Sequence, residues 1–166
     1  MNYASIKMYD IANGPGCRVS LFVSGCRNNC PGCFNKDAQD FNFGEKYTKE
    51  TESHILSALG DKHISGLSIL GGEPFEPENQ KDILNLCVNA KKMYPNKDIW
   101  IWTGFEWEDI NDLLIFDYID VLIDGPFLND MKDLSLAYRG SCNQRVIDIK
   151  KSIEAGYAVR LEGDWK

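Results

Sequence analysis

The stretch LSILGGEPFEP, Leu67 to Pro77, decides the fold that the sequence predicts. Its mostly apolar first half, residues 67–70, is typical of a short buried strand, and the two glycines after it end that strand. Pro77 then opens a helix at a position where its missing N–H leaves no helical hydrogen bond unmade. The helix is expected to run to about Met93. A strand that passes directly into a helix is the first half of a βαβ unit.

The same alternation continues on both sides of this stretch. Upstream, a β-branched and aromatic strand over 18–23 enters a long loop, 24–44, which is followed by a helix over 48–59 that Thr48 caps. Downstream, strands are predicted over 98–103 and 118–123, with a short helix over 106–114 between them; weaker strand candidates are 146–149 and 157–162.

Strands that alternate with helices form right-handed βαβ units around a parallel sheet. A closed eight-fold barrel needs roughly 200–250 residues, and this chain has 166. We therefore expect one α/β domain over residues 1–166, an open partial (β/α) barrel of about five or six βα units with a mostly parallel sheet.

Composition excludes several classes of function. Hydrophobic residues make up 43% and charged residues 26% of the chain, as in ordinary globular proteins. The net charge of -7 and the lack of a Lys/Arg cluster argue against a nucleic-acid partner. No apolar run approaches the roughly 18 residues that span a membrane, and the first residues do not resemble a signal peptide. A cytoplasmic protein without a membrane partner is expected.

Four unusual loops follow the predicted strands, and ligands of parallel α/β sheets bind beyond the carboxyl ends of the strands. These loops are the cysteine-containing segment 24–44, the GGEP turn at 71–74, the Thr103-Gly104 pair and the DGP turn at 124–126. They are expected to meet at one rim of the barrel.

Three of the six cysteines lie within eight positions, in the stretch CRNNCPGC from Cys26 to Cys33. Clustered cysteines in a cytosolic chain are more often metal ligands than disulfides. Three thiolates can bind three irons of a [4Fe–4S] cubane and leave the fourth iron open to a substrate. A structural zinc site would need a second ligand pair, and three unligated thiols would prefer burial. Cys17, Cys87 and Cys142 are interpreted as non-ligands, with Cys87 in the core.

The stretch CRNNCPGC resembles the signature of the radical S-adenosylmethionine enzymes, and GGEP at 71–74 resembles a second motif of that superfamily. NGPGCR at 13–18 resembles the DGPG-x-R lead-in of glycyl-radical activases, with Asn13 in place of Asp. LIDGPF at 122–127 and RGSCNQR at 139–145 resemble segments of the activases of anaerobic (class III) ribonucleoside-triphosphate reductases. Cys142 replaces a usual Ser, and Gly32 a frequent aromatic.

This resemblance implies a [4Fe–4S] cluster and S-adenosyl-L-methionine as cofactors. The reduced cluster would cleave S-adenosylmethionine to methionine and a 5′-deoxyadenosyl radical, which would take a hydrogen atom from a glycine of the reductase. The implied partners are the large subunit of anaerobic ribonucleoside-triphosphate reductase and a small reducing electron-donor protein.

The candidate residues follow from the motifs. Cys26, Cys30 and Cys33 are the expected catalytic iron ligands, and Glu73 is expected to accept a hydrogen bond from the methionyl amine. The complete set of candidate cofactor-binding residues is Gly32, Phe34, Gly71, Gly72, Glu73, Thr103 and Asp124.

Several roles stay open from sequence. Asp124 could bind ribose or a cation near the methionyl carboxylate, or cap its own turn. Arg18 could pair with an acidic group near the cluster or simply flank its strand. Trp100 and Trp102 are expected to face the core, and Asn143 and Arg145 to shape the edge that meets the partner.

Three alternative functions remain at this stage. They are an activase of another glycyl-radical enzyme such as pyruvate formate-lyase, a small-molecule radical enzyme such as a deazaguanine synthase, and a ferredoxin-like electron carrier. The segment RGSCNQR argues against the first, and a carrier needs neither an open iron nor the GGEP turn.

Overall fold

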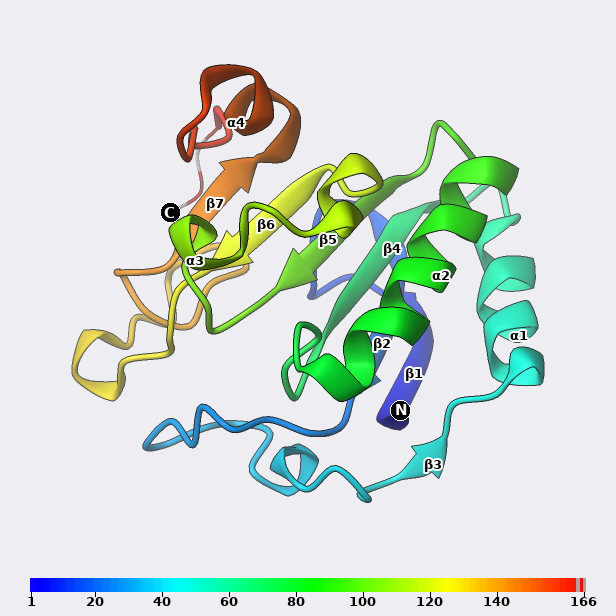
Figure 1. The fold of residues 1–166 in the computed structure, drawn as a ribbon, viewed down its shortest axis with the longest axis horizontal. Helices are drawn as coiled ribbons and strands as arrows, with labels where there is room; N and C mark the ends of the chain where they lie inside the picture. Colours follow the sequence, from blue (N-terminus) through cyan, green and yellow to red (C-terminus); the bar gives the residue numbers. More distant parts are fainter. Residues whose placement is uncertain (164, 166) are drawn as a thin grey trace.

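The computed structural model describes residues 1–163 and 165, and its strands form one mixed sheet (Figure 1). The strand order is β3-β1-β2-β4-β5-β6-β7. Neighbours from β2 to β6 are parallel, whereas β1 and β3 at one edge and β7 at the other are antiparallel. In chain order the strands are β1 (Asn2–Asp10), β2 (Cys17–Val23), β3 (Glu45–Lys46), β4 (Ile64–Gly71), β5 (Asp98–Trp102), β6 (Val121–Asp124) and β7 (Arg145–Asp148). The sheet is unclosed, which confirms the open partial barrel.

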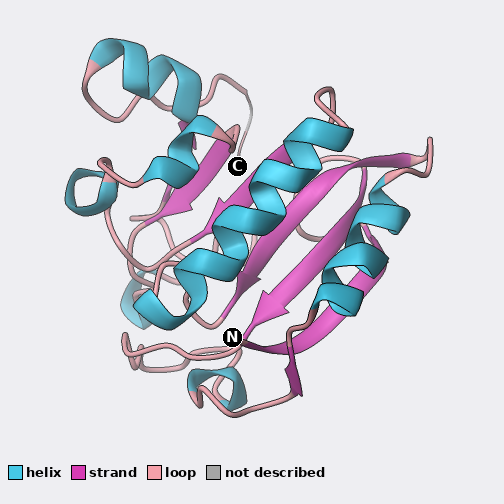
Figure 2. Ribbon diagram, turned by 45° about the vertical axis from the view of Figure 1, so that its right-hand side comes forward, coloured by secondary structure: helices cyan, strands magenta, loops and turns pink. Residues whose placement is uncertain are grey.

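The helices cover one face of this sheet, and Figure 2 shows the two longest lying side by side across it. Thr48 caps the first, as predicted: its hydroxyl accepts a hydrogen bond from the backbone N–H of Thr51. Pro77 begins the second. The α-helices are α1 (Lys49–Leu59), α2 (Pro77–Met93), α3 (Trp107–Ile110) and α4 (Ile149–Ala155), and the 3-10 helices are η1 (Asp37–Gln39), η2 (Leu114–Asp117) and η3 (Asn129–Met131).

Side chains alternate between the two faces of the strands, and the main core lies on the helix-covered face. There, Leu21, Ile69 and Ile101 from three parallel strands are fully buried against apolar residues of α1 and α2. The opposite, inner face has a smaller apolar cluster of Trp100, Val121, Ile123 and Val146. The inner face is therefore left with room for polar groups.

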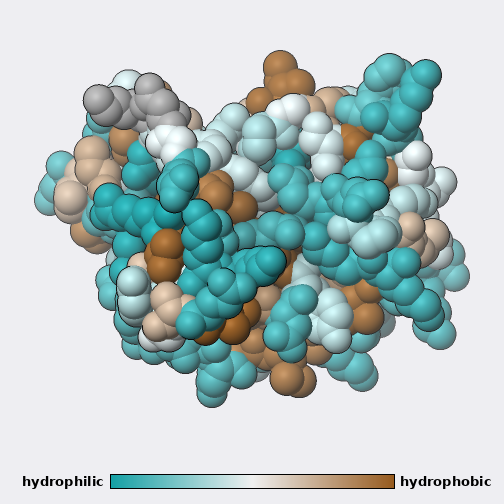
Figure 3. Space-filling model, turned by 90° about the horizontal axis from the view of Figure 1, so that it is seen from above, coloured by the Kyte–Doolittle hydropathy of each residue, from teal (hydrophilic) through white to brown (hydrophobic). Residues whose placement is uncertain are grey.

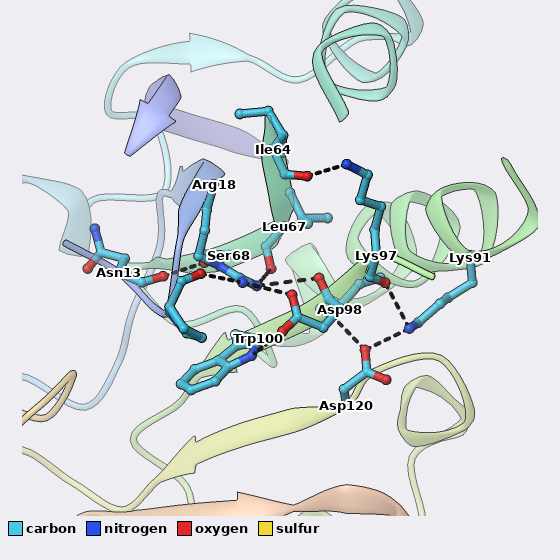
Figure 4. A network of polar contacts seen from close by, with 12 residues as sticks. Asn13, Arg18, Ile64, Leu67, Ser68, Lys91, Lys97, Asp98, Trp100 and Asp120 are labelled. Carbon is cyan, nitrogen blue, oxygen red and sulfur yellow. Dashed lines mark hydrogen bonds and ion pairs between the residues drawn. The ribbon is translucent and has the colours of Figure 1, made fainter. Parts of the chain in front are cut away.

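Arg18 is the largest polar group buried on the inner face, and its side chain has no exposed surface. Figure 4 shows its guanidinium beside Ser68, Leu67 and Asp98. Its guanidinium donates hydrogen bonds to Ser68 Oγ at 2.7 Å, Leu67 O at 2.9 Å and Asp98 Oδ1 at 2.7 Å. It also lies 5.5 Å from the ring centroid of Trp100. These contacts join the starts of β2 and β5 to the middle of β4. Arg18 does pair with an acidic group, Asp98. The predicted location near the cluster is wrong, because this pair lies at the end of the sheet remote from the cysteines.

Three local expectations differ from the structure. The sequence reading missed β1, although residues 5–9 alternate between exposed and half-buried side chains as an edge strand should. The segment 157–162 lies beside β7 without forming a regular strand: it makes one isolated bridge, from Arg160 to Ile147, and two further backbone hydrogen bonds to that strand. The helix expected over 106–114 divides into α3 and η2.

The end of the molecule opposite the cysteine loop is mostly hydrophilic. Figure 3 views that end from above and shows small, separate hydrophobic spots among polar residues. Within the described residues, no helix combines the length and the apolar character needed to cross a membrane.

Candidate active site

A cavity opens at the carboxyl ends of the parallel strands, and the side chains of Cys26, Cys30 and Cys33 all line it. All four predicted loops contribute residues to its wall. In Figure 1 the segments 24–44 and 126–144 lie at the same end of the sheet as the GGEP turn. The other lining residues are Asn28, Phe34, Asn35, Gln39, Leu70, Gly71, Gly72, Glu73, Trp102, Thr103, Gly104, Gly125, Phe127, Gly140 and Gln144.

Backbone hydrogen bonds fix the start of the cysteine loop against the GGEP turn. Gly25 N donates to Ala38 O at 2.8 Å, while Gly25 O accepts from Glu73 N at 2.8 Å. A Cβ added to Gly72 would lie 2.6 Å from Gly25 O and 2.9 Å from Ala38 O. Only glycine allows the three segments to approach this closely.

The donor set fits an iron–sulfur cluster. Each cysteine is half-buried and unbridged, and a cubane needs its three thiolates on three different irons. A structural zinc site needs four ligands around one metal, whereas the described part of the cavity wall combines three cysteines with no histidine. Burial raises the pKa of the Cys26 thiol to about 11, so binding iron must displace its proton.

Glu73 lies at the base of the cavity wall, with only 1% of its surface exposed. Its Oε1 accepts hydrogen bonds from Phe75 N at 3.0 Å and Thr103 Oγ1 at 2.8 Å. Its Oε2 accepts from Gly104 N at 2.8 Å and Asn28 Nδ2 at 3.2 Å. Burial raises the pKa of Glu73 to about 7, although the four hydrogen bonds favour the charged form. The carboxylate is thus positioned by neutral donors alone.

Asp124 does not face the cavity. It is fully buried, and its carboxylate accepts hydrogen bonds from Arg145 Nε at 3.0 Å and from Trp107 N at 2.9 Å. The pairing of β6 with β7 brings Arg145 opposite Asp124, so this carboxylate holds the fold together behind Gly125. Gly32 is also absent from the cavity wall and faces Asn129 instead. The structure therefore brings five of the seven candidate cofactor-binding residues to the cavity.

Several lining residues were not identified from sequence. Trp102 was expected in the core; it is half-buried and lines the cavity, whereas Trp100 is 2% exposed inside the inner apolar cluster. The position of Trp102 as the last residue of β5 was the available signal. Phe127 and Gln144 lie within the two segments that carried the family resemblance. Asn28 had no sequence signal beyond its place between two ligand cysteines.

The remaining cysteines match their interpretation. Cys87 is fully buried in the core, Cys17 lies at the remote end of the sheet, and Cys142 is exposed. None of the three lines the cavity.

Comparison with known proteins identifies close relatives. A family model described as a 4Fe-4S single cluster domain matches residues 12–147. The protein named anaerobic ribonucleoside-triphosphate reductase-activating protein in Escherichia coli K12 is 46% identical over 150 residues, which cover 88% of this chain and 97% of the relative. Proteins with the same name are 43% identical in Enterobacteria phage T4, covering 88% and 93%, and 43% identical in Vibrio cholerae, covering 87% and 96%.

Proposed function

We propose that this chain is the activase that generates the glycyl radical on its reductase, because it belongs to the family of anaerobic ribonucleoside-triphosphate reductase-activating proteins. The observation that carries the proposal is that Cys26, Cys30 and Cys33 line the same cavity as the Gly71–Glu73 turn. Three thiolates would hold three irons of a [4Fe–4S] cluster and leave the fourth iron for a small molecule.

The chain's own residues would bind and orient the cofactors. The three thiolates would hold the [4Fe–4S] cluster, which supplies the electron that cleaves S-adenosylmethionine. Gly71 and Gly72 would let the backbone approach the methionyl end of S-adenosylmethionine, and Glu73 would accept a hydrogen bond from its ammonium. Phe34 and Trp102 offer apolar surface for the adenosyl end. Phe34 is 67% exposed.

The proposed activity involves one domain and two protein partners. One domain, residues 1–166, would carry the whole site. The partners would be the large subunit of the anaerobic reductase and a small reducing electron-donor protein, in the cytoplasm and without nucleic acid or membrane. The close relationship to activating proteins of the same name supports the reductase as partner.

An anaerobic mixture of the reconstituted protein, its reductase, S-adenosylmethionine and a reductant tests this function. We expect an electron paramagnetic resonance signal of a glycyl radical on the reductase. Cys30→Ala should abolish both the cluster and the signal, because two thiolates cannot hold the cubane. Cys142→Ala, which changes an exposed cysteine outside the cavity, should retain both. A full cluster in Cys30→Ala, or no radical with the intact protein, contradicts the proposal.

A further inference from the structure

Glu73 differs from the other buried carboxylates at this end of the sheet because no cation accompanies it. Glu76 pairs with Arg27 and Asp124 pairs with Arg145. None of the ion pairs among the described residues includes Glu73. A buried carboxylate is stabilised by a paired charge. Glu73 is therefore prepared for a cationic ligand that the protein itself does not supply.

The four hydrogen bonds of Glu73 leave no acceptor position free for such a ligand. A carboxylate has about four in-plane lone-pair positions, and each Glu73 oxygen already accepts two hydrogen bonds. An incoming ammonium must consequently replace one of the present donors.

Asn28 is the donor that can leave. The other three donors are the backbone N–H groups of Phe75 and Gly104 and the hydroxyl of Thr103, which is 4% exposed. The hydrogen bond from Asn28 Nδ2 is the longest of the four, at 3.2 Å, and Asn28 is an exposed residue of the cysteine loop. Its amide lies directly over Gly104, where an added Cβ would be only 2.2 Å from Nδ2.

The same amide also holds part of the cysteine loop in place. Among the described residues, its contact with Glu73 is the only hydrogen bond that joins residues 28–34 to any residue outside the segment 24–44. This part of the loop includes Cys30 and Cys33. Exchange of the donor at Glu73 would therefore release the segment from the β4–β5 side of the cavity.

We infer that Asn28 is a positioning residue that occupies the ammonium position at Glu73 and is displaced when S-adenosylmethionine binds. The neutral amide donor gives way to a charged one, which makes the stronger hydrogen bond to a carboxylate. Ligand binding is thereby coupled to release of the loop between Cys26 and Cys33. The inference rests on the proposed function only in that S-adenosylmethionine is taken as the ligand.

Two ligands that differ in the amino-acid end test this exchange. S-adenosylmethionine has an aminocarboxypropyl group with the ammonium, whereas 5′-methylthioadenosine keeps the nucleoside but lacks this group, and its sulfur is neutral. Their affinities are measured on the anaerobic holoenzyme without reductant, so that no cleavage occurs. Asn28→Ala should bind S-adenosylmethionine about two- to tenfold more tightly than the wild type, the equivalent of one competing hydrogen bond. Binding of 5′-methylthioadenosine should not change.

Asn35→Ala is the matched control. Asn35 also lines the cavity from the cysteine loop, but its amide donates to Gly71 O at 3.5 Å and does not contact Glu73. The ratio of the two affinities should stay at its wild-type value in this variant. Weaker S-adenosylmethionine binding by Asn28→Ala, or an equal change for both ligands, overturns the inference.

A structure of the wild-type holoenzyme with S-adenosylmethionine provides a second readout that needs no variant. The hydrogen bond between Asn28 and Glu73 should be broken, with the ligand ammonium in its place; a retained hydrogen bond overturns the inference. Failure of the wild type to bind S-adenosylmethionine contradicts the proposed function as well. Normal binding with no preference of Asn28→Ala for the ammonium ligand contradicts only the role of Asn28.

Discussion

Gly72 is confined by backbone atoms on two sides, and this confinement predicts the effect of the smallest possible substitution. In Gly72→Ala the new methyl group would meet Gly25 O and Ala38 O, at 2.6 and 2.9 Å. Since backbone cannot rotate away as a side chain does, we expect a loss of about 1–3 kcal/mol in the free energy of unfolding, measured by urea denaturation. The iron content after reconstitution should also fall, because the cysteine loop is pushed from the GGEP turn.

Gly60→Ala is the comparison for this prediction. Gly60 has an ordinary φ of -69°, and its nearest neighbour is the hydroxyl at the end of the Tyr94 side chain, at 2.8 Å from the added Cβ. A side-chain end can move at small cost. Similar losses of stability and iron in the two variants would show that crowding at Gly72 is not what holds the two loops together.

At the residue level, the sequence was sufficient to identify side chains with a distinctive chemical role, such as clustered cysteines. It was not sufficient for residues whose role depends on a neighbour in the folded structure. Three closely spaced cysteines and a glutamate after two glycines have few alternative explanations, and the structure brings them to one cavity. Asp124 was ambiguous because its partner, Arg145, is 21 residues away in sequence and meets it only through the β6–β7 pairing. Asn28 was missed because an asparagine in a loop is ordinary until its neighbour is known.

Among the elements, the starts of β2 and β5 and the middle of β4 depend on one guanidinium. Arg18→Met would keep much of the side-chain volume but remove every hydrogen bond to Ser68, Leu67 and Asp98. A buried polar group left without its hydrogen-bond partner costs about 1–3 kcal/mol, whereas the Asp98 side chain is 39% exposed and can be hydrated. We expect a decrease in the free energy of unfolding near this range. Because the network lies at the end of the sheet remote from the cavity, iron bound per folded protein should stay at the wild-type value.

An exposed ion pair supplies the control for Arg18. Lys151 pairs with Glu162, which is 89% exposed, and surface pairs contribute about 0–1 kcal/mol. Urea denaturation of Lys151→Met should therefore give a nearly unchanged free energy of unfolding. A loss for Arg18→Met as small as this would mean that the buried network contributes little to the sheet.

The elements themselves were predictable where the sequence pattern was strong. The run at 67–70, the helix from Pro77 and the Thr48 cap all appear as expected, because strand burial, proline geometry and capping are local effects. The antiparallel edge strands were harder to predict. β1 buries only part of one face, and β3 has two residues, so tertiary pairing rather than local preference defines both.

For the whole molecule, the open rim predicts a dependence on the partner. The cavity that holds the cysteines is open at its rim, where Phe34 is 67% exposed. A radical intermediate must be shielded from water while it forms. We therefore expect the isolated protein to cleave S-adenosylmethionine slowly and without productive coupling, and the reductase to raise the rate while closing the site.

The ratio of methionine released to glycyl radical formed measures this coupling. With the reductase present it should approach about one methionine per radical if closure protects the intermediate. The same counts are taken without the reductase and after exposure to air, which should destroy a cluster that has one iron without a thiolate. Fast cleavage by the isolated protein, with no radical gained on adding the reductase, contradicts the predicted closure.

The residues of the cavity wall are far apart in the sequence, and this affects when iron can be delivered to the protein in the cell. The wall combines Cys26 near one end of the sequence with Gln144 near the other, and Asp124 reaches Arg145 only after β7 has joined the sheet. During synthesis on the ribosome, the cysteines emerge more than 100 residues before the last wall residue. The nascent chain can therefore present three thiols but no finished compartment. Iron delivery is expected to follow completion of the polypeptide, so maturation factors would meet an essentially folded apoprotein.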